Sequence, residues 1–211
     1  MKNIYFIRHG ESEGNIGQIR QTATTGLTKK GQSQAVFLAE RCAKLPIEVI
    51  ISSTMTRARE TADFILKKVS KPIEYSDLFV EKRRPSEVLG KSKDDPIAHE
   101  VEKETKAHFA EPGWKYSDEE NFEDVKKRAL DLLQYLAKRP EENILVVTHG
   151  FILRMIMACV LFGNNLTVEE SQRCIKTFHM ENTGITILGY DNDDNNSPWW
   201  LWVWNDHAHL G

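Results

Sequence analysis

The chain has 211 residues, of which 40% are hydrophobic and 28% are charged, and its net charge is −3. These values suit one sizeable core, so we expect a single domain over residues 1–211 that binds no nucleic acid. The longest apolar run, residues 155–162, is too short to cross a bilayer, and we expect no signal peptide. The three cysteines lie far apart and do not have the spacing of a zinc site or a disulfide framework. A cytoplasmic protein without a membrane partner is therefore expected.

The first predicted strand, residues 2–7, leads directly into Arg8 and His9. Residues 10–27 are rich in Gly, Thr, Gln and Ser, which is typical of an active-site loop. Thr28 then resembles the N-cap of a helix, because apolar residues recur behind it at helical spacing until Pro46.

A second short strand, residues 48–51, runs into a helix that carries Arg57, and residues 73–78 are predicted as a third strand. Residues 80–120 are polar, contain three prolines and show weak periodicity. We interpret them as an insertion with one helix near residues 96–109, which could form a lid over the site.

In the last third, Asn121 is the predicted N-cap of an amphipathic helix, and residues 144–148 form a fourth strand that leads into an apolar helix to residue 162. Thr167 resembles the start of a capping box. Residues 183–190 and 199–204 are predicted as a closing antiparallel hairpin with a polar loop at 191–198. Three tryptophans in its second strand alternate, which favours core packing over an exposed aromatic platform; they are Trp200, Trp202 and Trp204.

This order of elements predicts an α/β fold, a three-layer α/β/α sandwich around a mixed, mostly parallel sheet. Ligands bind at the carboxyl ends of the strands in such sheets. Arg8, His9, residues 52–57 and His149 all follow predicted strands, so the fold brings them together.

Two histidines beside two arginines suit phosphoryl transfer. Arg8 and Arg57 could donate to the phosphoryl oxygens, and one imidazole could attack phosphorus if its reacting nitrogen is unprotonated. Nearby guanidinium groups lower the pKa of a histidine and so favour that neutral form. The second histidine, if protonated, would add positive charge where the transition state is most negative.

These segments resemble the histidine phosphatase superfamily, also called the phosphoglycerate mutase-like family. The resemblance rests on four segments that follow in order along most of the chain: residues 8–12 with Asn15, residues 27–35, residues 52–62 and residues 148–150. It implies the phosphoglycerate mutase-like fold, no metal and no cofactor. It also implies that His9 is the nucleophile that becomes phosphohistidine, in a phosphate pocket completed by Arg8, Asn15, Arg57, His149 and Gly150.

The family's general acid is usually a carboxylate shortly after the third strand, which indicates Glu81, with Glu87 as the alternative. Arg83, and Arg20 in the first loop, could each bind a second anionic group of the substrate or simply be solvated.

The leading hypothesis is a metal-independent phosphomonoester hydrolase that acts on a small phosphorylated metabolite. A bisphosphoglycerate-dependent mutase is one alternative, but this chain reads Lys-Arg-Arg-Pro-Ser at residues 82–86, unlike the Glu-Arg-His-Tyr-Gly-type segment of such mutases. A non-catalytic phospholigand-binding protein is the other. An edge strand of the mixed sheet could also pair with its copy in a homodimer.

Overall fold

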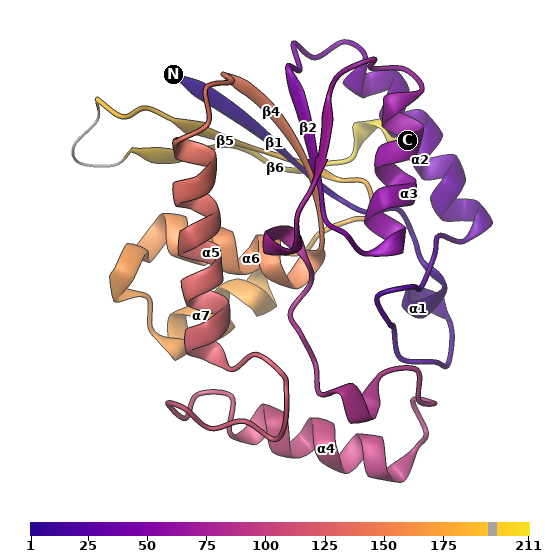
Figure 1. Ribbon diagram of the computed structural model, residues 1–211, viewed down its shortest axis with the longest axis vertical. Coiled ribbons are helices and arrows are strands. Elements are labelled where there is room, and N and C mark those ends of the chain that lie inside the picture. Colours follow the sequence, from indigo (N-terminus) through magenta and orange to yellow (C-terminus); the bar gives the residue numbers. More distant parts are fainter. Residues whose placement is uncertain (194–197) are drawn as a thin grey trace.

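The computed structural model describes residues 1–193 and 198–211, so part of the hairpin loop expected at 191–198 lies outside the described residues. A six-stranded sheet has the order β3-β2-β4-β1-β5-β6 (Figure 1). The first four strands of the chain pair in parallel and the last two are antiparallel. Their bounds are β1 Lys2–Arg8, β2 Val49–Ser52, β3 Ile73–Tyr75, β4 Asn143–Thr148, β5 Ile185–Tyr190 and β6 Trp199–Asp206. The predicted mixed, mostly parallel sheet is confirmed.

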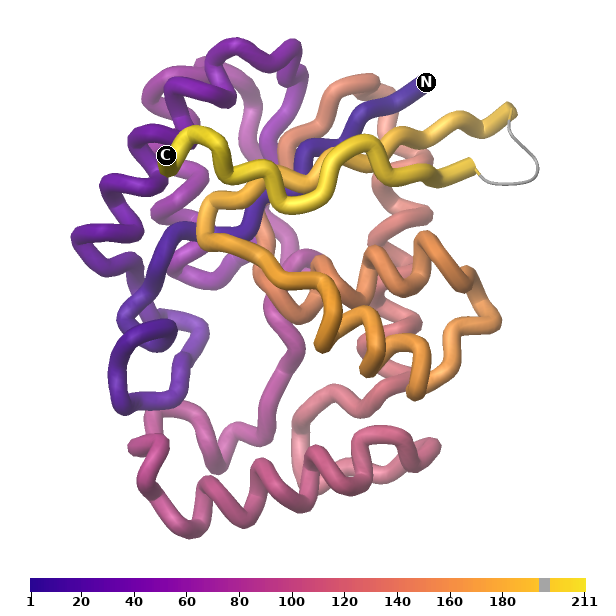
Figure 2. The backbone as a smooth tube through the Cα atoms, turned by 180° about the vertical axis from the view of Figure 1, so that it is seen from behind, coloured from indigo at the N-terminus to yellow at the C-terminus, as the bar shows by residue number. Residues whose placement is uncertain are grey.

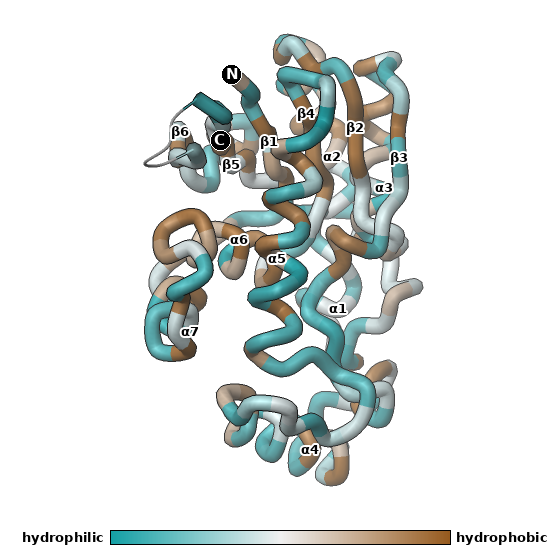
Figure 3. Tube along the Cα trace, turned by 60° about the vertical axis from the view of Figure 1, so that its left-hand side comes forward, coloured by the Kyte–Doolittle hydropathy of each residue, from teal (hydrophilic) through white to brown (hydrophobic). Residues whose placement is uncertain are grey.

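Helices cover both faces of this sheet (Figures 1 and 2). Side chains of β1 alternate, so Ile4 and Phe6 pack with one set of helices and Tyr5 and Ile7 with the other. The Ile4 face is covered by α5 Phe122–Ala137 and α6 Gly150–Phe162, and the Tyr5 face by α2 Lys29–Cys42 and α3 Thr56–Leu66. Residues 4–7 are all buried, as expected for a strand covered on both sides and seen as a run of apolar colour in Figure 3.

The predicted helix starts are real caps. Thr28 accepts a hydrogen bond from the backbone N–H of Gly31, and Asn121 forms a capping box with Asp124. Thr167 likewise caps α7 Val168–Thr177. Each cap satisfies an N–H group that the helix itself leaves without an acceptor.

Two segments near the strand ends differ from the expectation. The third strand stops at Tyr75 because the side chain of Ser76 accepts from the backbone N–H of Leu78, which starts the 3-10 turn η1 Asp77–Phe79. The first loop contains one helical turn, α1 Glu13–Ile16, which its polar sequence did not predict.

The insertion holds α4 Pro96–Ala107 and the 3-10 turn η2 Ser86–Val88. Its own small apolar cluster consists of Val88, Ala98 and Val101. Figure 1 places α4 beyond the carboxyl ends of the parallel strands, which is the end of the sheet that carries the predicted site residues.

The tryptophan pattern of β6 is broken by a bulge, so the prediction that its tryptophans share one face is wrong. The register shifts between Ile187, opposite Val203, and Leu188, opposite Leu201, which reverses the alternation. Trp204 therefore packs on the α5–α6 side, whereas Trp202 is 57% exposed. Among the described residues, no helix combines the length and the apolar character needed to span a membrane.

Candidate active site

His9 lies at the end of β1 and is only 3% exposed. Its Nδ1 is 2.7 Å from the carbonyl oxygen of Gly10, which can only accept, so Nδ1 carries the proton. Its Nε2 accepts a hydrogen bond of 3.2 Å from Nε of Arg57. Burial, and then the charge of Arg57, hold the pKa of His9 well below 6.5. The imidazole is thus neutral, with the lone pair on Nε2.

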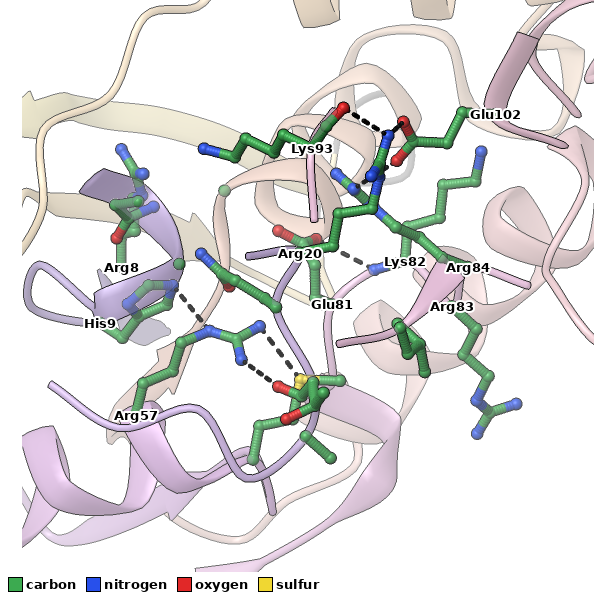
Figure 4. Close-up of a pocket in the computed structure, with 18 of the residues that line it drawn as sticks. Arg8, His9, Arg20, Arg57, Glu81, Lys82, Arg83, Arg84, Lys93 and Glu102 are labelled. Carbon is green, nitrogen blue, oxygen red and sulfur yellow. Dashed lines mark hydrogen bonds and ion pairs between the residues drawn. The ribbon is translucent and has the colours of Figure 1, made fainter. Parts of the chain in front are cut away.

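Two arginines surround this nitrogen (Figure 4). Arg57, in the first turn of α3, also donates to the carbonyl of Thr22 at 3.1 Å, and burial lowers its pKa to about 10. Arg8 donates from Nη1 to the carbonyl of Met180 at 2.6 Å. Its Nε is buried without a hydrogen-bond partner in the part of the chain that the structure describes. A buried donor without an acceptor is costly, so a phosphoryl oxygen would satisfy it.

His149 is the N-cap residue of α6, and its ring centroid lies 5.1 Å from that of His9. Its Nε2 is 2.8 Å from Oγ of Ser53, and its buried Nδ1 has no partner among the described residues. Burial, and then the neighbouring His9, hold its pKa well below 6.5. This low pKa favours the neutral form near pH 7, in which His149 acts as a hydrogen-bonding group rather than as a cation.

The carboxylate of Glu81 accepts hydrogen bonds from three backbone N–H groups. Its Oε1 accepts from Lys82 at 3.0 Å and from Ile152 at 3.1 Å, and its Oε2 accepts from Phe151 at 3.1 Å. Two of these donors belong to the first turn of α6, where the helix dipole favours a carboxylate. The alternative acid, Glu87, is exposed and accepts from Oγ of Ser117 at 2.7 Å instead.

A pocket of about 980 Å³ opens over this group (Figure 4). Seven of the predicted residues line it together with His9: Arg8, Asn15, Arg20, Arg57, Glu81, Arg83 and Gly150. His149 is fully buried beside His9 rather than in the lining, and Glu87 is not in the lining either. Most residues predicted for the phosphate pocket thus line one pocket, which contains the candidate acid Glu81 and not the alternative Glu87.

Arg20 lines the pocket, and its guanidinium is engaged within the protein rather than solvated. Its guanidinium donates to Glu102 of α4 at 2.9 Å, to the carbonyl of Lys93 at 3.3 Å and to the carbonyl of Ser92. Its donors thus join the first loop to the insertion. Asn15 accepts from the backbone of Ser12 at 2.9 Å and so holds the turn after the first strand.

Several lining residues were missed from the sequence. Lys82 directly follows the predicted acid and could have been found there, but Lys93 and Arg154 follow no pattern that predicts them. Arg154 donates to the carbonyl of Gly150 at 3.0 Å and to that of Ile175 at 2.8 Å.

The loop before β5 braces the histidine strand, which the sequence also did not predict. Asn182 donates to the carbonyl of His9 at 2.8 Å, and Thr183, with φ of 61°, donates from its backbone to Arg8 at 2.9 Å. Residues 1–193 and 198–211 contain no group of three His, Cys, Asp or Glu side chains that could hold a metal ion.

Comparison with known proteins agrees with this geometry. The profile of the histidine phosphatase superfamily (branch 1) matches residues 4–206. A metal-independent phosphoserine phosphatase of Arabidopsis thaliana is 32% identical over 98% of this chain and 82% of its own length. A probable phosphoglycerate mutase GpmB of Enterobacter sp. (strain 638) is 28% identical over 100% of this chain and 95% of its own. The structure of YhfR from Bacillus stearothermophilus superposes with a TM-score of 0.82 at 26% identity, over 100% of both chains. The chain therefore belongs to the histidine phosphatase superfamily.

Proposed function

We propose that the protein is a metal-independent phosphomonoester hydrolase that acts on a small phosphorylated metabolite through a phosphohistidine on His9. The observation that carries this proposal is the state of that imidazole. Its Nδ1 proton is held by the carbonyl of Gly10, and its Nε2 lone pair faces the side chain of Arg57. A neutral, oriented imidazole between two arginines is a nucleophile for a phosphoryl group.

In the first step, Nε2 of His9 attacks phosphorus, the P–N bond forms, and the ester P–O bond breaks. Without substrate, Nε of Arg57 donates a hydrogen bond to the Nε2 lone pair that must attack. The guanidinium must therefore turn from His9 toward a phosphoryl oxygen when the substrate binds. Arg8 offers its unpartnered Nε to the same group. The arginines therefore exchange contacts within the protein for contacts to the phosphate.

Glu81 gives the proton to the departing ester oxygen. Its Oε1 already accepts two N–H groups and its Oε2 only one, so Oε2 retains the lone pair that can hold a proton. In the second step, water attacks phosphorus, Oε2 takes the proton of that water, and the P–N bond breaks. Inorganic phosphate leaves, and the lone pair returns to His9.

A mutase would use the same histidine to return the phosphoryl group to a second substrate oxygen. Relatives named as probable phosphoglycerate mutases keep this alternative open. Hydrolysis is favoured by the relative named a phosphatase at 32% identity and by residues 82–86, which do not resemble the mutase segment. A binding protein without turnover would not need the neutral nucleophile or the carboxylate at Glu81.

The test is hydrolysis of p-nitrophenyl phosphate by the wild type and by His9→Ala, each with and without EDTA, from pH 5 to 8. His207→Ala is the matched control, because that histidine is exposed and outside the pocket. We expect activity that survives EDTA and His207→Ala and disappears in His9→Ala. Full activity in His9→Ala would exclude the mechanism. Faster conversion of 3- to 2-phosphoglycerate than hydrolysis, in a coupled assay, would favour the mutase.

A further inference from the structure

We infer that Lys93 is a specificity-determining residue, and that it selects phosphomonoesters that carry a second negative charge, such as a carboxylate, remote from the phosphate. This inference rests on the proposed function. It begins with the lining of the pocket, which holds far more cations than one phosphate needs. Arg8 and Arg57 already surround the nucleophile, and a further set lines the outer part, namely Arg20, Lys82, Arg83, Arg84, Lys93 and Arg154.

Most of these outer cations are already engaged. Arg20 and Arg84 share the carboxylate of Glu102, at 2.9 and 3.2 Å. The ammonium of Lys82 lies 3.9 Å from the ring centroid of Phe109. Arg154 is bound by two backbone carbonyls, as described above. These side chains shape the pocket, but their donors or charges are largely used within the protein.

Lys93 is different. Its ammonium has neither an ion pair nor a hydrogen bond to any residue that the structure describes, although it lines the pocket. In Figure 4 its side chain extends from the insertion toward the side of the pocket where Arg8 lies, whereas Arg83 points away from His9. An exposed, unpaired cation that lines the same pocket as the nucleophile is placed to meet a second charged group of a bound substrate.

The backbone of Lys93 is held in place by the first loop. Its N–H donates to the carbonyl of Gln18 at 2.6 Å, and its carbonyl accepts from Arg20 at 3.3 Å. Arg20 is in turn only 5% exposed and is fixed by Glu102. Glu102 is therefore a positioning residue: through Arg20, it helps to hold the backbone from which the Lys93 side chain extends into the pocket.

The charge balance indicates the kind of substrate. The two inner arginines match the phosphate charge, so the charge of Lys93 remains for a second group. A substrate whose remote group is neutral would leave this ammonium hydrated and would gain no binding energy from it. A remote carboxylate would instead form a partly exposed ion pair with Lys93. Lys93 is exposed, so such a pair changes affinity by up to about fivefold.

The experiment compares 3-phosphoglycerate with glycerol 3-phosphate, which differ only by a carboxylate in place of a hydroxymethyl group. The readout is the inhibition constant of each against p-nitrophenyl phosphate hydrolysis, so it does not depend on turnover of either compound. Lys93→Gln should weaken 3-phosphoglycerate by up to about fivefold and leave glycerol 3-phosphate unchanged. The control is Lys91→Gln, an exposed lysine outside the lining, which should leave both constants unchanged.

Glu102→Gln separates positioning from overall charge. Loss of this carboxylate makes the pocket more positive, so charge alone would strengthen 3-phosphoglycerate. Positioning through Arg20 predicts the opposite, a weaker preference for the carboxylate. Equal effects of Lys93→Gln on both compounds, the same effect from Lys91→Gln, or a stronger preference in Glu102→Gln would overturn the inference. No hydrolysis of p-nitrophenyl phosphate by the wild type would instead reject the proposed function itself.

Discussion

Glu81→Gln tests the proposed acid in two measurable ways. The amide oxygen can keep the N–H groups of Lys82 and Ile152, but the amide nitrogen then faces the N–H of Phe151, which loses its acceptor. A buried donor left unpaired costs about 1–3 kcal/mol, so the free energy of unfolding should fall by that amount in a urea titration followed by circular dichroism.

The kinetic effect of Glu81→Gln should depend on the leaving group. An alkyl phosphate such as glycerol 3-phosphate needs the acid, and its hydrolysis should slow about 10²- to 10⁴-fold. p-Nitrophenolate leaves without a proton, so the first step should survive while water attack slows. A rapid release of about one nitrophenolate per enzyme, followed by slow turnover, should then appear in stopped flow.

The control for this prediction is Glu87→Gln, which lies outside the pocket lining and should behave as the wild type. Equal losses in the two variants, or slow turnover of p-nitrophenyl phosphate without an initial release, would refute the assignment of both roles to Glu81.

Four further predictions follow from the buried titratable groups. Arg57→Lys removes the bond from Nε to His9 and should lower kcat/KM at least about 10²-fold, whereas Arg59→Lys, on the ring of Tyr75, should stay within twofold in the same assay. Because the pKa of His9 lies well below 6.5, kcat/KM should stay level through pH 6 and fall only in more acidic buffer; a midpoint near 6.5 would contradict the neutral nucleophile. Both buried histidines have depressed pKa values, so stability is full above about pH 6.5 and falls below it, by up to about 1.4 kcal/mol per histidine per pH unit, in urea titrations at pH 7 and 5.5. Burial raises the pKa of Cys42 and Cys159 to about 12, so native protein should not react with a thiol reagent until urea unfolds it.

The inner site was predictable because strand ends in a parallel sheet meet at one edge. Apolar runs before His9 and His149 fixed those ends, and the two rings indeed lie in contact. The Glu81 assignment rested on family resemblance, and the structure adds what the sequence could not show, namely the N–H groups of α6 on its carboxylate.

The outer site was not predictable, since it depends on contacts between irregular segments. From the sequence, Arg20 could bind the substrate or be solvated, and only the placement of Glu102, 82 residues later, shows where its guanidinium goes. The bulge in β6 likewise depends on pairing with β5, so the tryptophan alternation in the sequence was misleading. Period and spacing describe regular elements well, but they carry no information on such long-range contacts.

The position of β1 in the sheet bears on how the chain folds as it is synthesised. Its two neighbours are β4 and β5, which lie at Asn143–Thr148 and Ile185–Tyr190. A nascent chain on the ribosome therefore holds an unpaired apolar strand until most of its length has emerged, and such strands are prone to aggregate. The nucleophile that follows β1 therefore reaches its place in the site only after this late pairing with β4 and β5.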